Sequence, residues 1–387
     1  MRRLALPPRP NWQQKVEQVG LTFHTTDDGK SYWDESACYE FTSGEVEQIE
    51  SATLALNDLC LQAVDHVVRS NLFREFGIPA DFHGYLKRSW DEDEITILGR
   101  FDLLYDGVNP PKLAEYNADT PTALVEAAIV QWYWLRDVSP QADQFNSLHE
   151  KLIDAWKRVK NEMGGPISFT CIEGHLEDYL TTTYLRDTAH QAGLLTQFLP
   201  ISAVGWNPQR QRFVDMHERP IHCLCKLYPW EWLMRESFGA SIPGAPTRWL
   251  EPAWKSLLSN KALLPLLWKL FPDHPNLLPS SWKPLAGRHV RKPTLGREGA
   301  NITIYDGDST VASTSGGYGD GDFVYQGYHE TPRFGGHTAV LGSWMVNGHA
   351  CGLGIREDDG WITTNTSRFV PHRIATPDTS ISARVKP

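Results

Sequence analysis

Residues 99–119, GRFDLLYDGVNPPKLAEYNAD, hold two alternating, strand-like runs on either side of the segment DGVNPP. The Asp, Gly, Asn and Pro residues of that segment are typical of a hairpin connection. Side chains two positions apart in a strand point to the same face. The run R-x-D therefore places Arg100 and Asp102 together, and the run E-x-N does the same for Glu115 and Asn117. The stretch predicts a β-hairpin with four polar side chains above one sheet.

These four side chains have the chemistry of a metal and phosphate site. Two carboxylates and an amide oxygen are ligands that suit Mg²⁺, and an arginine beside them suits a phosphate bridged by that ion. Alternation alone is weak support, because a solvated hairpin with cross-strand ion pairs gives the same pattern. The sequence leaves both interpretations open at this point.

A second polar stretch, GREGANITIYDG at residues 296–307, follows Lys292. Its small residues let backbone N–H groups approach an anion, and Arg297 and Glu298 lie within it. A lysine that enters a flexible glycine loop between two strands is typical of a lid over a triphosphate. A β-hairpin with a charged tip is the alternative.

The rest of the chain alternates between helical and strand-like patterns. Residues 44–75 and 122–137 predict helices, and residues 165–202 predict a strand, a helix and a second strand in a β-α-β unit. We expect a hairpin at 209–229, mostly helix at 246–271 and glycine-rich strands at 287–370. The pattern predicts an α+β protein with mixed sheets.

Composition narrows the class of protein. The chain has 387 residues, 41% of them hydrophobic and 15 of them tryptophan, so it has enough apolar surface to fold into several subdomains. Its net charge of −10 argues against nucleic acid or an anionic membrane as a partner, because both require a basic surface. The start, MRRLALPPRPNW, has prolines where a signal peptide has its apolar core, and no window approaches the roughly 20 apolar residues that span a bilayer. We expect a cytoplasmic protein.

Several common site motifs are missing from the sequence. There is no GxxxxGK[ST] loop, and GGYGDGD lacks the third glycine and the following helix of a dinucleotide site. HERPIH has a proline between its histidines, which rules out the helical geometry of a zinc protease, and no GxSxG occurs. The cysteines do not have zinc-site spacing, so we expect them to be reduced and structural: Cys38, Cys60, Cys171, Cys223, Cys225 and Cys351.

Longer motifs resemble one family across nearly the whole chain. The stretches GRFDLLYD, AEYNADTPT, EGHLEDY, SNKALLPLLWKLFPDHPNLLPS, RKPTLGREGANI and GLGIREDDGWITTNTSRFVPH are similar, in order, to the synthetase domain of glutathionylspermidine synthase, an ATP-grasp amide ligase. The resemblance is to the stand-alone bacterial members, which lack the amidase domain of the bifunctional enzymes. It implies an ATP-grasp-like α+β fold of the glutathione-synthetase type, with mixed sheets and a glycine-rich lid.

The same resemblance implies one synthetase unit over residues 1–387. Within it we expect a helical scaffold with the metal hairpin at 1–160 and a β-α-β substrate subdomain at 161–245. The lid and the nucleotide-binding region occupy 246–387.

The resemblance also assigns roles to single residues. Arg100 matches the arginine that contacts ATP and the activated carboxyl group, and Asp102, Glu115 and Asn117 match the magnesium ligands. The other residues that match ATP contacts are Lys261, Lys292, Glu298, Gly299, Gln326 and Arg356. Thr120, Glu177 and Asp178 match substrate contacts, and Asp178 stands where the family has a glutamate, which leaves glutathione itself in question.

The function implied is that of an ATP-dependent carboxylate–amine ligase. ATP with magnesium, two ions expected, converts a peptide-like carboxylate to an acyl phosphate, and a polyamine-like amine then attacks it. A catalytically silent nucleotide-binding protein of the same fold is the main alternative, and a β-rich interaction module is the third. The sequence does not identify the acid, the amine or the oligomeric state.

Overall fold

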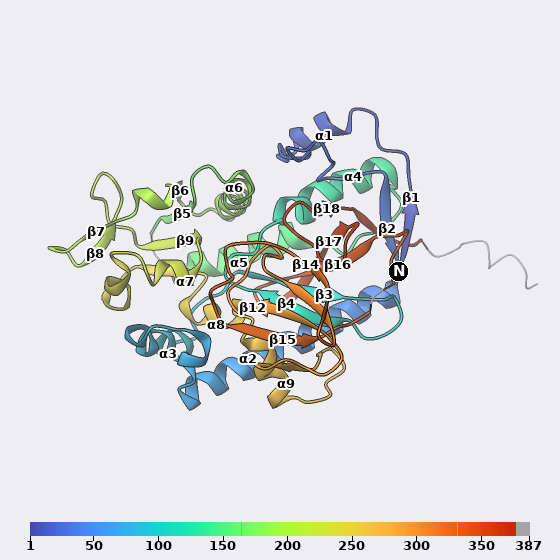
Figure 1. Ribbon diagram of the computed structural model, residues 1–387. Helices are drawn as coiled ribbons and strands as arrows, with labels where there is room; N and C mark the ends of the chain where they lie inside the picture. The colour runs from blue at the N-terminus through green and yellow to red at the C-terminus, as the bar shows by residue number, and fades with distance from the viewer. Residues whose placement is uncertain (164, 331, 377–387) are drawn as a thin grey trace, which may run out of the picture.

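The hairpin predicted at residues 99–119 is part of a five-stranded central sheet. The structure is a computed structural model that describes residues 1–163, 165–330 and 332–376. In the central sheet the strand order is β18 (Arg368–Phe369), β17 (His349–Asp358), β16 (Thr338–Val346), β3 (Leu98–Leu104) and β4 (Lys112–Asn117). All neighbouring strands are antiparallel. The sheet therefore joins the first third of the chain to its last part (Figure 1).

The register of the hairpin sets its four polar residues opposite one another. Arg100 pairs with Asn117, and Asp102 pairs with Glu115. A bulge follows Asp102, with Ala114 as the extra residue of β4. The bulge leaves the Ala114 carbonyl outside the strand ladder, free to accept a hydrogen bond from elsewhere. The prediction that four polar side chains share one face of this hairpin is confirmed.

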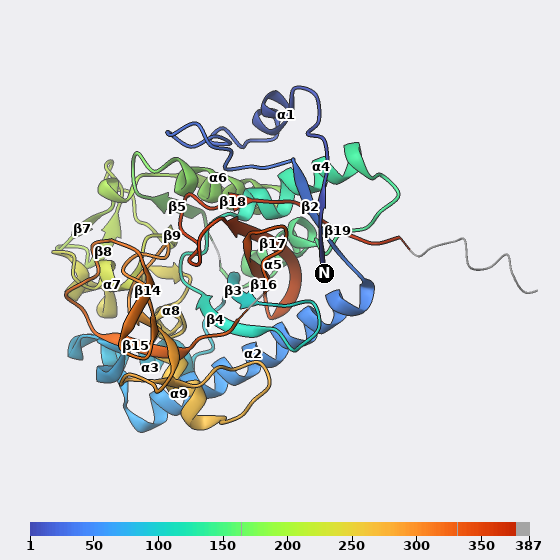
Figure 2. The same cartoon turned by 45° about the vertical axis from the view of Figure 1, so that its right-hand side comes forward.

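The opposite face of the central sheet is apolar and covered by a helix. Four side chains of the hairpin belong to the larger hydrophobic core: Phe101, Leu103, Leu113 and Tyr116. Helix α2 (Ser43–Ser70) packs on β16 and β17, and the Thr53 and Ser343 hydroxyls are 2.7 Å apart across this contact. Figure 2 shows α2 running along the sheet. Burial on one face leaves the other face of the hairpin free for polar chemistry.

The helix predicted at 44–75 is confirmed for most of its length. It begins at a capping box formed by Thr42 and Glu45. It ends at Ser70 because Asn71 adopts a left-handed conformation, with φ of 53°. The helix expected at 122–137 is also present, as a π-helical turn, Glu126–Val130, followed by α4 (Gln131–Val138).

A second sheet is parallel. Its strand order is β10 (Arg248–Leu250), β9 (Cys223–Leu227), β5 (Ile167–Cys171) and β6 (Thr196–Phe198). Helix α6 (Leu176–Gln191) connects β5 to β6, which confirms the predicted β-α-β unit.

The prediction of a hairpin at 209–229 is wrong for the second half of that segment. A short hairpin does form, from β7 (Gly205–Asn207) and β8 (Arg212–Val214), but β9 leaves it and lies between β5 and β10. All five residues of β9 are buried. Burial on both faces is typical of a parallel strand.

A third sheet, which we call the lid sheet, comes from the predicted strand-rich region 287–370, except for β11, which precedes that region. Its order is β11 (Ser280–Ser281), β15 (Phe323–Gly327), β12 (Arg288–Pro293), β13 (Thr303–Asp306) and β14 (Ser309–Ser313). The glycine stretch identified in the sequence lies in the loop between β12 and β13, residues 294–302, which we call the lid loop.

The remaining elements complete the scaffold. A small sheet has the order β1 (Arg2–Ala5), β2 (Ala37–Phe41) and β19 (His372–Ile374). The other helices are α1 (Trp12–Gln18), α3 (His83–Asp91), α4 (Gln131–Val138), α5 (Leu148–Glu162), α7 (Trp230–Leu233), α8 (Ser256–Ser259) and α9 (Leu263–Leu270). The region 246–271 is therefore mostly helical, as predicted, although β10 precedes its helices.

Two further expectations concern the whole chain. The six cysteines are buried and unpaired, as expected. In the described residues, no helix has the length and apolar character needed to cross a membrane. The division of the chain into segments at 1–160, 161–245 and 246–387 stays a prediction.

Candidate active site

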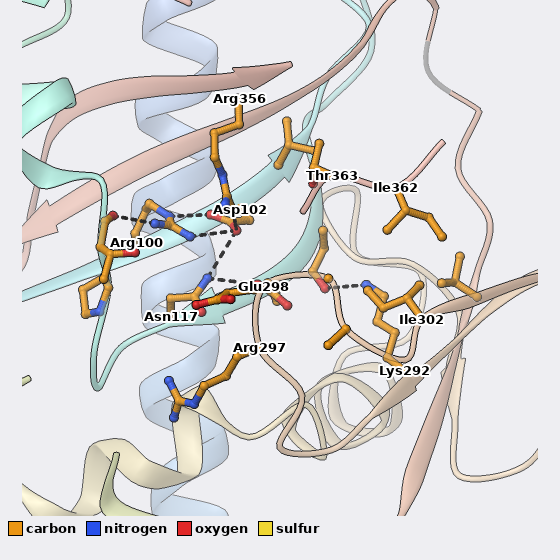
Figure 3. A pocket seen from close by; sticks show the side chains of 18 of the residues that line it. Arg100, Asp102, Asn117, Lys292, Arg297, Glu298, Ile302, Arg356, Ile362 and Thr363 are labelled. Carbon is orange, nitrogen blue, oxygen red and sulfur yellow. Dashed lines mark hydrogen bonds and ion pairs between the residues drawn. The ribbon is translucent and has the colours of Figure 1, made fainter. Parts of the chain in front are cut away.

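One cavity, about 400 Å³ in volume, lies where the hairpin, the lid sheet and the parallel sheet meet. Every residue predicted for the site lines this cavity except Lys261 and Glu177. The lining residues from the predicted set are Arg100, Asp102, Glu115, Asn117, Thr120, Asp178, Lys292, Glu298, Gly299, Gln326 and Arg356. Figure 3 shows the side chains of Arg100, Asp102, Asn117, Lys292 and Arg356 converging from strands that are far apart in the sequence.

Arg100 and Asp102 form a buried, two-point ion pair. Arg100 Nε donates to Asp102 Oδ1 at 2.7 Å, and its Nη2 donates to Oδ2 at 3.1 Å. Its Nη1 donates to the Thr122 carbonyl at 2.7 Å, so the guanidinium has no freedom to turn. Burial lowers the pKa of Arg100, but the charge and hydrogen bonds of Asp102 outweigh it and hold the pKa above its usual value. This arginine is a fixed positive charge at the cavity wall.

Glu115 and Asn117 adjoin this pair. Asn117 Nδ2 donates to Asp102 Oδ2 at 3.2 Å and to Glu115 Oε1 at 3.1 Å. The Lys261 ammonium lies 2.8 Å from Glu115 Oε2. Burial raises the pKa of Glu115, but Lys261 and Lys292 outweigh it and hold that pKa well below its usual range. Asp102, Glu115 and Asn117 are thus neighbours around one point.

This set of side chains fits magnesium. Among the described residues no group of three His, Cys, Asp or Glu side chains forms a metal cluster, so a complete protein cage is not available. Magnesium does not need one, because it is usually bound by one or two carboxylates together with substrate phosphates and water. Asp102 and Glu115 supply the carboxylates, and a half-turn of the Asn117 amide would bring its oxygen to the same point.

Lys292 and Gln326 join the lid sheet to the hairpin. Lys292 Nζ donates to Gln326 Oε1 at 2.7 Å and to the Ala114 carbonyl at 3.0 Å, which is the carbonyl freed by the bulge. Gln326 Nε2 in turn donates to the Leu113 carbonyl at 2.9 Å. Burial lowers the pKa of Lys292 to about 8. The lysine is oriented toward the cavity by uncharged oxygens, so its charge is available to an anion.

The lid loop closes against a second loop, residues 359–367, which we call the C-terminal loop. Glu298 and Gly299 have φ values of 55° and 70°, both in the left-handed region. A Cβ on Gly299 would lie 2.2 Å from the Thr363 carbonyl oxygen. Only glycine allows this approach, and it brings the lid loop over the cavity.

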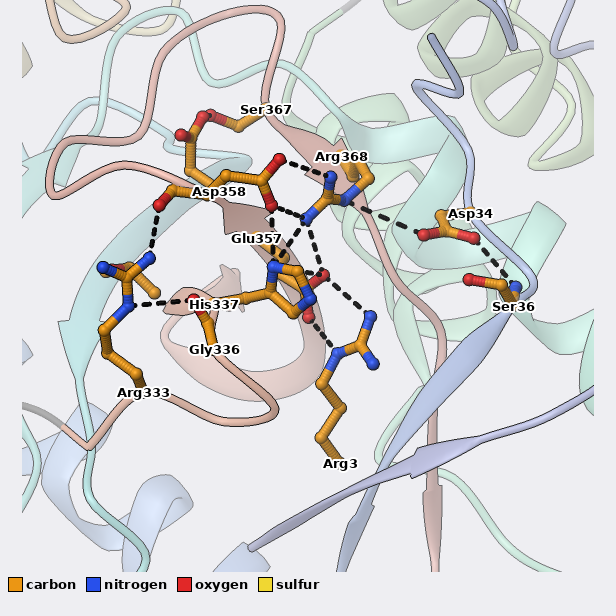
Figure 4. A network of polar contacts seen from close by, with 12 residues as sticks. Arg3, Asp34, Ser36, Arg333, Gly336, His337, Glu357, Asp358, Ser367 and Arg368 are labelled. Atoms are coloured by element: carbon orange, nitrogen blue, oxygen red, sulfur yellow. Dashed lines mark hydrogen bonds and ion pairs between the residues drawn. The ribbon is translucent and has the colours of Figure 1, made fainter.

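The C-terminal loop is held at its base by a polar network (Figure 4). Ser367 Oγ donates to Asp358 Oδ2 at 2.6 Å, which closes the two ends of the loop. The next residue of the chain, Arg368, donates to Glu357 Oε1 at 3.0 Å, and Arg3 Nε donates to Glu357 Oε2 at 2.6 Å. Glu357 is fully buried. The network fixes the loop that faces the lid.

The end of the cavity near α6 is acidic. Asp178 lines the cavity and Glu177, its neighbour in the first turn of α6, does not. Burial and the charge of Glu177 raise the pKa of Asp178 to about 6. The same two causes raise the pKa of Glu298. Negative charge therefore gathers at this end, where a cationic group would be stabilised.

Thr120 lines the same cavity and accepts a hydrogen bond from a residue of the lid loop. Arg297 Nη1 donates to Thr120 Oγ1 at 2.7 Å, and its Nη2 donates to Glu231 Oε1 at 2.6 Å. Glu231 belongs to α7. Arg297 thus connects the lid loop to the residue after the hairpin and to the segment that follows β9.

The sequence matches one known family over almost all of its length. The family described as "Glutathionylspermidine synthase preATP-grasp" matches residues 3–375. The chain belongs to the glutathionylspermidine synthase family. The family recognised from the ordered motifs is confirmed.

Two relatives show how the chain compares with other glutathionylspermidine synthase-like proteins. A Haemophilus influenzae protein named "Putative acid--amine ligase" is 40% identical over 384 residues, which cover 95% of this chain and 97% of that protein. Trypanothione synthetase of Crithidia fasciculata is 28% identical over 352 residues, which cover 82% of this chain and 54% of that protein. The chain spans about half the length of this second relative.

A solved structure supports the fold predicted from the family. The glutathione synthetase-like effector of Globodera pallida, in its apo form, superposes with a TM-score of 0.61. The superposition covers 94% of this chain and 96% of that one at 11% identity, so it bears on the fold alone. The predicted α+β, ATP-grasp-like fold of the glutathione-synthetase type is confirmed.

Several cavity residues of this glutathionylspermidine synthase family member were not predicted. They are Arg297, Arg333, Trp232, Tyr318 and the run Trp361, Ile362 and Thr363. Two features of the sequence could have indicated Arg297 and the run at 361–363. Arg297 lies inside the glycine stretch already singled out, and the run lies in the polar segment DDGWITTNTS, which begins two residues after Arg356.

Proposed function

We propose that this protein is an ATP-dependent carboxylate–amine ligase that joins a peptide-type carboxylate to a polyamine-type amine and releases ADP and phosphate. The observation that carries the proposal is the single cavity in which two carboxylates, an amide and several cations converge beneath a glycine lid. Membership of the glutathionylspermidine synthase family supports the same chemistry. The acidic end beside α6 supports a cationic amine.

Each group of residues has a role in the proposed reaction. A carboxylate is a poor acylating agent, so it is first converted to an acyl phosphate that the amine then attacks. Arg100, fixed by Asp102, meets negative charge that develops on the transferred phosphoryl group and on the tetrahedral oxygen. Water must be excluded, because it would hydrolyse the acyl phosphate, and the lid loop provides this cover.

The nucleotide is proposed to bind to the lid side of the cavity. The residues in this role are Arg100, Lys261, Lys292, Glu298, Gly299, Gln326 and Arg356. Asp102, Glu115 and Asn117 would hold magnesium, two ions in this proposal, which supplies positive charge to the phosphates. Thr120, Glu177 and Asp178 are proposed to contact the two other substrates.

The test of this function is ADP release measured with ATP and magnesium over pairs of peptide acids and polyamines. Release that requires both partners supports a ligase. A rise of the melting temperature with magnesium and ATP but no ADP release with any pair would favour a silent nucleotide-binding protein, because a ligand that binds the folded state stabilises it. No thermal shift would favour a β-rich interaction module without nucleotide chemistry.

Lys292→Ala is expected to raise the KM for ATP by at least about tenfold, because a charge-assisted bond to a phosphate contributes about 1.5 to 3 kcal/mol. Arg100→Ala is expected to act mainly on kcat, since its charge is proposed to serve the transition state. Steady-state ADP release over a range of ATP concentrations measures both. The exposed Lys283→Ala is the matched control. Equal effects of the two variants on both parameters would contradict this division.

Glu177→Gln is expected to raise the KM for a cationic amine by about tenfold or more and to leave the KM for ATP near its original value. The variant keeps the size of the side chain and removes a charge that lies outside the cavity lining but acts on Asp178, which lines the cavity. Glu150→Gln, at an exposed position of α5, is the control. If Glu177→Gln lowers the melting temperature and leaves amine kinetics unchanged, the residue only stabilises the first turn of α6.

Two broader proposals concern the cellular location of the protein and its division into subdomains. We place the protein in the cytoplasm, which its six unpaired and buried cysteines support. The three segments predicted from the sequence, 1–160, 161–245 and 246–387, are proposed as its subdomains.

A further inference from the structure

A buried aspartate lies between the metal hairpin and the cavity wall and has no role in the function proposed above. Asp119 comes two residues after Asn117 and directly before Thr120, and its exposed fraction is 2%. Its Oδ1 accepts a hydrogen bond from Lys226 Nζ at 2.5 Å, and its Oδ2 accepts one from the Trp230 N–H at 2.8 Å. Both oxygens of this carboxylate are therefore bound by the protein itself.

The partners of Asp119 come from three different elements. Lys226 belongs to β9, and Trp230 is the first residue of α7. The Asp119 N–H donates to Ser259 Oγ of α8 at 2.8 Å, and the Ala118 N–H donates to the same oxygen at 2.9 Å. One short turn after the hairpin thus joins β9, α7 and α8.

Stability alone is a weak explanation for the ion pair. The side chains of Lys226 and Asp119 are both completely buried. Lys226 is the one charged residue of β9, and its ammonium group lies 4.7 Å from the centre of the Trp230 ring. Taking two charges out of water is expensive, and apolar side chains of similar volume often give equal or higher stability. The geometry that the pair imposes is the better explanation.

Asp119 holds the backbone beside both acceptors of the lid arginine. Arg297 donates to Thr120 Oγ1 at 2.7 Å and to Glu231 Oε1 at 2.6 Å. Thr120 follows Asp119 in the chain. Glu231 follows Trp230, whose N–H is bound to Asp119. One carboxylate therefore determines how far apart the two acceptors lie.

We propose that Asp119 is a positioning residue that holds Thr120 and Glu231 at the spacing that Arg297 requires. With both acceptors in place, the arginine bridges them and the lid loop stays over the cavity. When the spacing is lost, Arg297 can bind only one acceptor, and the lid loop opens to water more often. This inference rests on the proposed function for its kinetic effects, whereas the closure of the lid loop can be measured without any reaction.

A pair of substitutions removes the carboxylate without leaving a buried charge. The double variant Asp119→Leu with Lys226→Met, which we call the charge-free variant, places apolar side chains of similar volume at both positions. We expect its melting temperature to stay within about 5 °C of the wild-type value. Arg9→Met with Glu35→Leu is the matched control, because it removes another buried ion pair, of 2.6 Å, outside the cavity lining.

Trypsin measures whether Arg297 is held. The protease must take the arginine side chain into its own pocket, so it cuts after Arg297 only when that side chain has left Thr120 and Glu231. In the charge-free variant we expect this cleavage to be about tenfold faster or more, with or without magnesium and the β,γ-imido analogue of ATP. Cleavage after the exposed Arg210, between β7 and β8, should keep its wild-type rate in both.

Steady-state kinetics show whether Asp119 acts through Arg297. Arg297→Ala and the charge-free variant should each lower kcat/KM for ATP by about 30-fold, which corresponds to the loss of one charge-assisted hydrogen bond. The combined variant should lose no more than about 50-fold, because both changes remove the same contact. Independent effects would multiply to about 1,000-fold.

Three results would overturn the inference. They are cleavage after Arg297 at the wild-type rate in the charge-free variant, an equal acceleration in the control variant, and kinetic losses that multiply. Each would leave the ion pair with a structural role only. If the wild-type protein releases no ADP with any acid and amine, the proposed ligase function fails, but the trypsin comparison still tests Asp119.

Ser259→Ala tests the same turn if the charge-free variant does not fold. It removes the oxygen that accepts from the Ala118 and Asp119 N–H groups and leaves the ion pair intact. Cleavage after Arg297 should then rise by about threefold, which corresponds to the loss of an uncharged hydrogen bond. An unchanged cleavage rate in Ser259→Ala would also count against a positioning role for this turn.

Discussion

Asp102→Asn is expected to lower turnover by about 1,000-fold. Asp102 accepts both guanidinium bonds of Arg100, a bond from Asn117, and a longer contact of 3.5 Å from Arg356. An amide in its place has the same shape but no charge, and its Nδ2 would meet the donors of Arg100. The variant therefore loses a proposed metal ligand and the fixed orientation of the arginine at once.

ADP release at several magnesium concentrations measures this effect. Circular dichroism and the melting temperature show whether the fold persists, which we expect because the side chain faces a cavity rather than the apolar core. The exposed Asp154→Asn, on α5, is the matched control. Turnover near the wild-type level at high magnesium would remove Asp102 from the metal site.

The hairpin could be predicted because local sequence determines it. The turn segment DGVNPP fixes the connection, and a period of two fixes which side chains share a face. These two facts alone predict that Arg100, Asp102, Glu115 and Asn117 share one face, whereas their proposed roles come from the family resemblance. The bulge at Ala114 could not be predicted, because it depends on how β4 pairs with β3.

The error at β9 has a different cause. All five residues of β9 are buried, so the strand has no alternation of apolar and polar residues. A run of this kind is compatible with either a hairpin partner or a parallel partner. The choice is made by β5 and β10, which lie tens of residues away and cover both edges of the strand. Long-range pairing of this kind is invisible in a local pattern.

The site was predicted best where residues share one element and least where loops meet. Arg297 reaches Thr120 and Glu231 only when the lid loop is folded over the cavity. Thr363 contacts Gly299 only because the polar network around Glu357 holds the C-terminal loop in place. Neither contact has a periodic signature, so composition and spacing could indicate a flexible loop but not its partner.

The contact between these two loops leads to the second large effect. Gly299→Ala is expected to lower kcat/KM for ATP by about 100-fold. A Cβ at this position would lie 2.2 Å from the Thr363 carbonyl oxygen, which is closer than any real contact, and φ of 70° disfavours alanine by a further 1 to 2 kcal/mol or so. One of the two loops must move, and both line the cavity.

The lid sheet contains a matched control for this variant. Gly317, between β14 and β15, has no atom within 4 Å of an added Cβ and no positive φ. Gly317→Ala should therefore keep wild-type kinetics, although it makes the same chemical change in the same region. Initial rates of ADP release over a range of ATP concentrations compare the two variants, and melting temperatures check that both are folded.

A second substitution identifies the clash itself. The atom that a Cβ at position 299 would meet is a main-chain oxygen, so removal of the Thr363 side chain cannot relieve it. The double variant Gly299→Ala with Thr363→Ala should be as slow as Gly299→Ala alone. Recovery in the double variant would mean that the side chain, not the main chain, limits the approach of the lid. Wild-type kinetics in Gly299→Ala would mean that the lid loop need not reach the C-terminal loop for ATP to be used.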